Sequence, residues 1–341
     1  MPADAGYNPD DRENTAPADE NAAPESVDTT SPIEVDEERF YDLTHEQYHA
    51  DPVIEGSISS SALKVMISKS PKHALCYIRN GRPPKGYLDL GQAVHTHLLG
   101  GPEIVYFGKG DGNDAWNASG GKAFRRESRD AGLIPLLLDQ KPTVEGMVDA
   151  VRRHPDLGIW LEPGAFVAEQ SGFWIDQTTQ LWCRLRTDAT HDDGTGTLTV
   201  VDVKTAYDVS PDAIARALAN TRYDVQKVHY EAGLRRLMDL GVIPEMDIVY
   251  VLAFVESAEP FDVVIRRIGE ETTAFAHRHR RWAMDRFLTC IETGEWPGFD
   301  DPVLRDDDTD PDEIPTADAP YWQLKRWADE DARYDIPGDR F

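Results

Sequence analysis

The sequence has few cysteines, and this scarcity excludes several classes of protein. Its 341 residues contain only Cys76, Cys183 and Cys290, which lie far apart along the chain. Their odd number and wide spacing argue against a disulfide framework, a zinc ribbon and a four-cysteine iron–sulfur cluster. We therefore expect no iron–sulfur cluster, and a reducing cytoplasm as the natural setting.

The sequence also lacks a long apolar run. No stretch approaches the roughly 20 apolar residues that span a bilayer, so we expect no membrane partner. The first residues, Met-Pro-Ala-Asp, show neither the basic nor the apolar region of a secretory signal. Hydrophobic residues still make up 40% of the chain, which is enough for one large domain or two small ones.

Positive charge is scarce overall, but the imbalance is concentrated in two segments. The net charge is −27; residues 1–38 hold twelve acidic residues and one basic residue, and residues 300–319 hold nine and one. These segments carry −19 of the total, so the remaining chain carries only −8. The acidity therefore does not exclude a local basic groove that binds nucleic acid.

Composition divides the chain into three parts. Residues 1–50 are rich in Pro, Ala, Asp and Glu, and we expect an acidic, mostly disordered tail. Residues 51–299 form the folded domain, with a helical part over 56–160 and a core over 161–299. Residues 300–341 are expected to be an acidic linker followed by a short amphipathic helix that includes Tyr321 to Trp327.

The hydrophobic period changes near residue 165. Helical patterns, including residues 88–99 and 142–154, precede three strand-like runs over 165–174, 181–188 and 197–204. Short turns between these runs favour antiparallel neighbours. Helices are expected over 211–218, 223–240 and 270–291, and further strands over 247–255 and 261–268. This order predicts an α/β fold with a central mixed sheet flanked by helices and preceded by a helical extension.

The end of the second run and the end of the third run carry the chemistry. Asp188 ends one strand, and Asp202 lies two residues before Lys204 in the next. Adjacent strands are about 5 Å apart, so both carboxylates can approach one cation. The main-chain carbonyl of Val203 is a natural third ligand for Mg²⁺, which prefers oxygen. Lys204 shares a strand face with Asp202 and could orient or deprotonate a water or stabilise charge on a phosphate.

Taken alone, this pattern is weak, because an Asp-x-Lys in a strand is common and is usually a solvated surface pair. Other motifs accompany it in a particular order. They are Ile58-Ser59-Ser60-Ser61-Ala62-Leu63 with Ser70-Pro71, Gly91-Gln92-Ala93-Val94-His95, Glu169-Gln170-Ser171-Gly172-Phe173-Trp174, Arg184-Leu185-Arg186-Thr187-Asp188, Val201-Asp202-Val203-Lys204-Thr205-Ala206, and Tyr223-Asp224-Val225-Gln226 with Tyr230. Together they resemble the PD-(D/E)xK nuclease superfamily, in its RecE-like (exonuclease VIII) and phage Cas4/RecB-like exonuclease branch, over about residues 56–292.

The resemblance implies a restriction-endonuclease-like core and assigns roles to residues. His95, Asp188 and Asp202 would bind metal, and Lys204 would be catalytic. Gln226 and Tyr230, four residues apart on one helix face, would line the active site and contact DNA. The alternatives are that the histidine is structural, with His97 as a competitor, and that Gln226 and Tyr230 only pack.

Other residues each have two possible roles. Glu169 could coordinate or order a second metal or be a plain surface residue. DNA contacts are expected from Lys122, Arg125 and Arg126, and from Lys64, Lys69 and Lys72 in the first helices; the alternative is a solvated helix face. Asp202 departs from the glutamate of many superfamily members. The Cas4 proteins of CRISPR systems hold a cysteine-bound cluster that three dispersed cysteines cannot supply, so the RecE-like comparison is the better one.

The resemblance implies a magnesium-dependent exonuclease, with Mn²⁺ as an alternative ion. It would degrade linear duplex DNA ends to single strands for phage or prophage recombination, beside a single-strand annealing protein. It would act as a homo-oligomer in the bacterial host cytoplasm. Two alternatives stay open: a catalytically inactive nuclease-fold protein that binds DNA or acts as a scaffold, and a restriction-type endonuclease.

Overall fold

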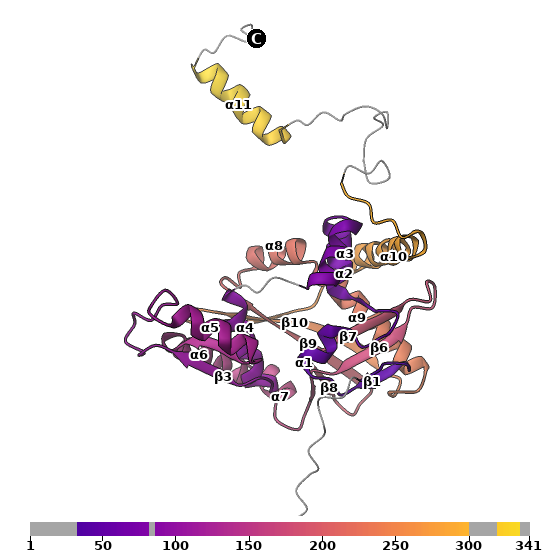
Figure 1. Cartoon of the computed structure of the whole chain (residues 1–341), viewed down its shortest axis with the longest axis horizontal. Coiled ribbons are helices and arrows are strands. Elements are labelled where there is room, and N and C mark those ends of the chain that lie inside the picture. Colours follow the sequence, from indigo (N-terminus) through magenta and orange to yellow (C-terminus); the bar gives the residue numbers. More distant parts are fainter. Residues whose placement is uncertain (1–32, 82–85, 300–318, 335–341) are drawn as a thin grey trace, which may run out of the picture.

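The computed structural model describes residues 33–81, 86–299 and 319–334 (Figure 1). Before the core lie β1 (Arg39–Tyr41), α1 (His45–Ala50), β2 (Ile58–Ser59), α2 (Ser60–Ser68), α3 (Pro71–Asn80), α4 (Gly86–Leu99), β3 (Ile104–Phe107), α5 (Gly121–Asp130), β4 (Ile134–Leu137), the short helix η1 (Leu138–Gln140), α6 (Lys141–Arg153) and α7 (Leu157–Trp160). Then follow β5 (Val167–Ala168), β6 (Ser171–Ile175), β7 (Trp182–Arg186), β8 (Ala189–Asp192), β9 (Thr197–Ala206), α8 (Pro211–Thr221), α9 (Tyr223–Asp239), β10 (Asp247–Glu256), β11 (Val263–Arg266), α10 (Glu270–Thr293) and α11 (Tyr321–Tyr334).

A five-stranded mixed sheet forms the centre, with the strand order β11-β10-β9-β8-β5. Its two longest strands, β9 and β10, are parallel and paired over ten residues each. Their side chains alternate between two hydrophobic cores: Val200 and Leu252 enter one, and Val201 and Val251 enter the other. Because both faces are covered, these strands read as nearly continuous apolar runs. The predicted α/β class with a central mixed sheet is confirmed.

Helices cover the two faces of this sheet. One core contains buried residues of α2, α9 and α10, such as Leu63, Leu234 and Phe287. The other contains residues of α4 and α6, such as Val94 and Met147, with residues of β4. Figure 1 shows α4, α5 and α6 together at one side of the molecule, and α2, α3 and α10 at another. Strands β9 and β10 therefore lie between two helical layers.

A second sheet, with the order β1-β6-β7-β2, continues the first through a bend. Strand β5 pairs with β8 in one sheet and β6 pairs with β7 in the other, both antiparallel. Between these pairs the hydrogen bonds continue: the N–H of Glu169 donates to the carbonyl of Asp188 at 3.0 Å, and that of Thr187 to Gln170 at 3.1 Å. One long antiparallel pair thus crosses both sheets, and Glu169 faces Asp188 at the crossing.

The structure corrects several boundaries. The run 181–188 is not one strand: β7 ends at Arg186, and an unpredicted β8 lies between it and β9. The part expected to be helical, 56–160, also contains β2, β3 and β4. Strands β3 and β4 are four residues each and pair in parallel across α5, so neither carries a local hairpin pattern.

The expected tail also extends too far into the chain. Residues 33–50 include β1 and α1, and Val35, Leu43 and Tyr48 are buried with Phe173 in a small third core. These few apolar residues are enough to order the segment because β1 pairs with β6. Residues 1–32 and 300–318, which carry most of the expected tail and linker, lie outside the described residues. Within the described ranges, no helix is long and apolar enough to cross a membrane.

A buried ionic network joins β6 and its turn to α10. Asp176 accepts hydrogen bonds from Arg280 at 2.9 Å and from the hydroxyl of Thr179 at 2.9 Å, and Arg281 lies 3.2 Å away. Arg280 also contacts Nδ1 of the buried His229 at 3.3 Å. Burial by itself would raise the pKa of Asp176, but the hydrogen bonds from Thr179 and the charge of Arg280 outweigh it and hold the pKa well below its usual range.

We expect Asp176→Ala to lower the free energy of unfolding at pH 7 by about 3–5 kcal/mol, because it leaves Arg280 buried without its partner. The lowered pKa means that the carboxylate contributes stability above its unfolded value and loses it as the pH falls further, so the difference from the wild type should shrink below about pH 4. Urea unfolding at several pH values measures this. Glu245→Ala, which removes an exposed partner of Arg235, is the control and should change little. A difference that stays constant down to pH 3 would contradict the ionic explanation.

Candidate metal centre and active site

The site forms where β8 begins beside the longer β9. The first β8 pair is Ala189 with Val201, so Val203 has no strand partner on that edge. Side chains take the place of the missing strand. The Val203 N–H donates to Asp188 Oδ2 at 2.8 Å, and Nε2 of His95 lies 3.0 Å from the Val203 carbonyl oxygen. The contacts that pair the main-chain N–H and carbonyl of Val203 therefore bring the Asp188 carboxylate and the His95 imidazole together.

His95 reaches the strand because α4 packs closely against it. A Cβ atom at Gly91 would lie 3.1 Å from Thr205 Oγ1, so the helix is already within tight contact distance of β9 at this position. Gly91 and His95 are one turn apart, and the close approach at Gly91 lets the imidazole reach the edge of the sheet. Nε2 of His95 lies 3.8 Å from Asp188 Oδ2.

Glu169 completes a three-residue group with His95 and Asp188. One ligand atom from each of the three residues lies within 4.8 Å of the other two, and this is the one such His, Cys or carboxylate group found in the described part of the chain. Glu169 has a φ of 51°, which is uncommon for a residue other than glycine. Its carboxylate accepts a hydrogen bond from Arg186 Nε at 2.5 Å, and Arg186 also donates to Ser171.

Asp202 lies beside this group but is held by other partners. Its Oδ1 is ion-paired with Lys204, and its Oδ2 accepts hydrogen bonds from Gln226 Nε2 at 3.2 Å and from the Tyr250 hydroxyl at 2.9 Å. It is 2% exposed. Asp202 is on β9, whereas Asp188 lies in the bend between β7 and β8 and does not end a strand as predicted. Only Asp188 belongs to the three-residue group.

The two aspartates differ in their electrostatics. Burial raises the pKa of Asp188 to about 6; His95 opposes the shift, and the charge of Asp202 adds to it. Burial acts on Asp202 as well, but the nearby Lys204 outweighs it and lowers the pKa of Asp202. For Lys204, burial favours loss of the proton, but Asp202 and Asp188 prevail and raise its pKa. The amine is therefore positively charged at neutral pH.

Of the remaining predicted site residues, some are at the site and some are engaged elsewhere. The Val203 carbonyl oxygen lies 3.0 Å from Nε2 of His95. Tyr230 is 8% exposed and packs edge-on against Tyr250, with ring centroids 6.4 Å apart, so it supports the site from the core. Lys122 is exposed on α5, away from these contacts.

Arg125 has a different environment from the one expected of a DNA-binding residue. With Arg129 it binds the buried Asp89 of α4, at 2.8 and 2.7 Å, and its guanidinium lies 4.8 Å from the centre of the Trp116 ring. The structure therefore places Arg125 in an ionic contact that ties α5 to α4, and it is not a freely available surface cation.

Sequence reasoning missed two residues at the site and named a third for a different contact. Tyr250, which binds Asp202, and Arg186, which binds Glu169, were missed. Lys64 was expected to contact DNA, and in the structure it donates to Gln226 Oε1 at 2.6 Å. The ammonium groups of Lys64 and Lys204 both lie over the Tyr223 ring, at 5.5 and 5.1 Å from its centre. Arg186 is within a quoted motif and could have been suspected. Tyr250 gave no signal, because only the parallel pairing of β9 with β10 brings it beside Asp202.

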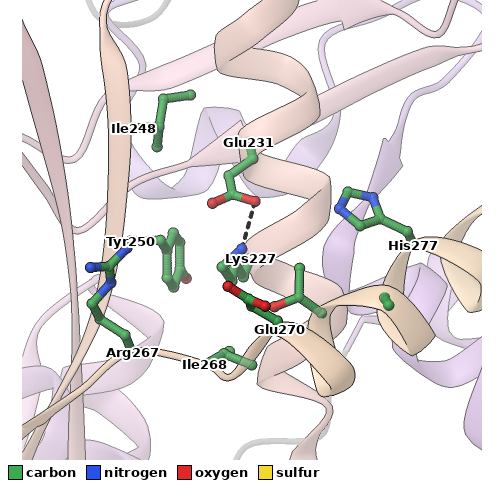
Figure 2. Close-up of a pocket in the computed structure, with 10 residues that line it drawn as sticks. Lys227, Glu231, Ile248, Tyr250, Arg267, Ile268, Glu270 and His277 are labelled. Atoms are coloured by element: carbon green, nitrogen blue, oxygen red, sulfur yellow. Dashed lines mark hydrogen bonds and ion pairs between the residues drawn. The ribbon is translucent and has the colours of Figure 1, made fainter.

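A separate pocket of about 420 Å³ lies between α9, β10 and the start of α10 (Figure 2). Lys227 and Glu231, joined at 2.8 Å, line it, with Tyr250 at its wall and Arg267 and His277 at its rim (Figure 2). It contains none of the three residues His95, Glu169 and Asp188. The pocket is therefore distinct from the candidate metal centre.

This architecture, with Asp188 at the sheet bend and with Asp202 and Lys204 on the central strand β9, is that of a PD-(D/E)xK nuclease fold. Residues 59–300 match a family described as a PDDEXK-like domain of unknown function, so the chain belongs to that family. A comparison with curated proteins gave no match. The fold is also similar to a crystal structure of a protein from Eubacterium rectale named a "putative exonuclease", with a TM-score of 0.52 and 11% identity, over 83% of this chain and 98% of that one.

The raised pKa of Asp188 predicts a pH-dependent stability of the metal-free protein. The partly buried Asp188 carboxyl has a pKa of about 6, against an ordinary value of 3.8, so its ionisation costs stability increasingly from about pH 4 to pH 6 and in full above that range. We therefore expect Asp188→Asn, measured in EDTA, to raise the melting temperature at pH 8 and to have a much smaller effect at pH 4.5. Asp149→Asn, at an exposed position of α6, is the control and should behave alike at both pH values. A lower melting temperature for Asp188→Asn at pH 8 would contradict the assignment.

Proposed function

We propose that the protein is a metal-dependent deoxyribonuclease. One observation carries the proposal: His95, Glu169 and Asp188 converge at the sheet bend, next to the Asp202–Lys204 ion pair. Carboxylate and imidazole ligands beside a fixed cation suit the hydrolysis of a phosphodiester, whose reaction needs stabilisation of negative charge. Membership of the PDDEXK-like family supports the same reading.

The donor set fits a divalent cation. Two carboxylates and an imidazole offer ligand atoms within 4.8 Å of one another, and the Val203 carbonyl oxygen lies 3.0 Å from His95. Burial and the charge of Asp202 raise the pKa of Asp188, and a bound cation would offset both effects. Asp188, Glu169 and His95 would hold the ion, with Asp202 adjacent. When bound, Mg²⁺ or Mn²⁺ supplies Lewis acidity toward phosphate and water. Mg²⁺ accepts such oxygen-rich sites with several waters retained.

The chain's own groups have separable roles in this proposal. Lys204 remains charged because Asp202 and Asp188 raise its pKa, so it would stabilise negative charge developing on the phosphate and would not act as a base. Gln226 and Tyr250 hold the Asp202 carboxylate, which in turn orients Lys204. Arg186 restrains Glu169. These contacts preorganise the site before DNA arrives.

The finer assignment is an exonuclease that degrades linear duplex ends to single strands. The motif order shared with RecE-like enzymes supports it, and the E. rectale structure bears an exonuclease name. By the same resemblance we propose Mg²⁺ as the ion, a homo-oligomer, a role in phage or prophage recombination with a single-strand annealing protein, and a cytoplasmic location. Lys122 remains a proposed DNA contact.

Two other functions are weaker. An inactive DNA-binding or scaffold protein would have no need for an intact set of metal ligands and a charged lysine. A restriction-type endonuclease needs a part that recognises a base sequence. Helices α2, α4 and α6, which lie within 56–160, contribute Leu63, Val94 and Met147 to the two cores of the central sheet, so these helices build the fold.

We expect purified protein to bind Mn²⁺, measured by calorimetry or by electron paramagnetic resonance. His95→Ala and Asp188→Ala should each weaken binding by about tenfold or more, because each removes a direct ligand. His97→Ala is the matched control, since His97 lies on the exposed face of the same helix, and its affinity should be unchanged. Equal Mn²⁺ affinity in the wild type and all three variants would contradict the assignment of the metal centre.

We expect the protein with Mg²⁺ to release nucleotides from linear duplex DNA and to leave closed-circular DNA intact. Lys204→Ala should lower the rate by about 100-fold or more, as loss of a transition-state charge partner does in other enzymes. Lys141→Ala, an exposed residue of α6, should retain the wild-type rate. Prompt linearisation of circles would show an endonuclease, and no cleavage of either substrate would support the inactive alternative. Labelled 5′ and 3′ ends in the same assay give the polarity.

A further inference from the structure

Lys64 of α2 is a second lysine at the site and comes from a distant part of the chain. Its Nζ donates to Gln226 Oε1 at 2.6 Å, across 162 positions in sequence. The contact is partly buried, and Lys64 also lies over the Tyr223 ring. Helix α2 packs against α9 through Leu63 and Val225, so its neighbour Lys64 is carried by a rigid element. This inference rests on the proposed function of the same site.

The contact selects one orientation of the Gln226 amide. An ammonium group can only donate a hydrogen bond and a carboxylate can only accept one. With Lys64 on one side and Asp202 on the other, the carbonyl oxygen must face Lys64 and the NH₂ group must face Asp202, and both contacts are present. Asp202 and Lys64 favour the same orientation: the carboxylate accepts from the NH₂ group, and the ammonium donates to the carbonyl oxygen at the other end of the amide. Without Lys64, Gln226 would lose the contact that fixes this other end of its amide.

The position of Gln226 also affects Lys204, because both residues bind Asp202. Asp202 Oδ2 is held by Gln226 and Tyr250, which leaves Oδ1 to pair with Lys204. A Gln226 side chain without its contact to Lys64 would be held less firmly against Asp202, and the position of the Lys204 ammonium would loosen with it. We propose that Lys64 is a positioning residue: it orients Gln226, through it Asp202, and thereby places Lys204 for phosphodiester cleavage.

A direct phosphate contact is the competing role, because Lys64 is a cation near the site. The two roles predict different kinetics. A residue that binds DNA in the ground state and the transition state alike changes KM, whereas one that places a catalytic group changes kcat. The 2.6 Å bond to Gln226 favours positioning, since the ammonium already has a protein partner at the site.

The first test compares Lys64→Met, Lys64→Arg and Arg79→Met, the last at an exposed position of α3, on linear duplex DNA with Mg²⁺. We expect Lys64→Met to lower kcat by about 10- to 100-fold with KM nearly unchanged, as misplacement of a catalytic group does. Lys64→Arg, which keeps a charged donor, should recover most of kcat, and Arg79→Met should match the wild type. A raised KM with unchanged kcat would overturn positioning in favour of phosphate contact.

The second test asks whether Lys64 acts through Gln226. In a Gln226→Leu background, Lys64→Met should cause little further loss of kcat, because the group that it orients is gone. An equal loss in both backgrounds would overturn the proposal. The wild type, the two single variants and the double variant can also be unfolded by urea in EDTA. The changes in unfolding midpoint caused by Lys64→Met and Gln226→Leu should not add up in the double variant, and additive changes would count against the contact. This readout needs no cleavage, so a wild type without nuclease activity would defeat the proposed function while the unfolding cycle still decides whether Lys64 holds Gln226.

Discussion

The unpaired edge of β9 at Val203 is the constraint on which the site depends. Strand β8 begins only at Ala189, so the main chain of Val203 must find partners other than a strand. Asp188 and His95 supply them, one from the sheet bend and one from α4. The same interactions that satisfy the backbone gather a carboxylate, an imidazole and a carbonyl oxygen at one point. The hydrogen bonds that satisfy the Val203 main chain therefore also bring together the candidate metal ligands.

The two aspartates near this point have pKa shifts in opposite directions. Asp188 is partly buried near Asp202 and Glu169, and its pKa rises to about 6, whereas Asp202 pairs with Lys204 and has a lowered pKa. Crowded negative charge is unfavourable for folding in the absence of a cation, and functional sites commonly carry such a cost. The Asp176–Arg280 network, on another part of the structure, shows the contrasting arrangement, in which every charge already has its partner.

Much of the fold could be predicted from local patterns, and the failures have physical causes. The long helices α9 and α10 and the strands β9 and β10 carry strong periodicity, and their positions agree within a few residues. The small strand β8, the division of the run 181–188 and the ordered segment 33–50 were missed. Each depends on pairing with a distant strand or on a handful of buried residues, as with Leu43 and Tyr48 against Phe173. Local composition contains little of that information.

The sequence by itself determined the class of fold and the identity of the central chemical groups, because alternation of apolar residues and the spacing of Asp188, Asp202 and Lys204 are written along the chain. Only the tertiary structure decided that Glu169 joins His95 and Asp188, that Asp202 is held by Tyr250, and that Lys64 reaches Gln226. Those contacts join strands and helices far apart in sequence. They arise from sheet register and helix packing, which no local spacing encodes.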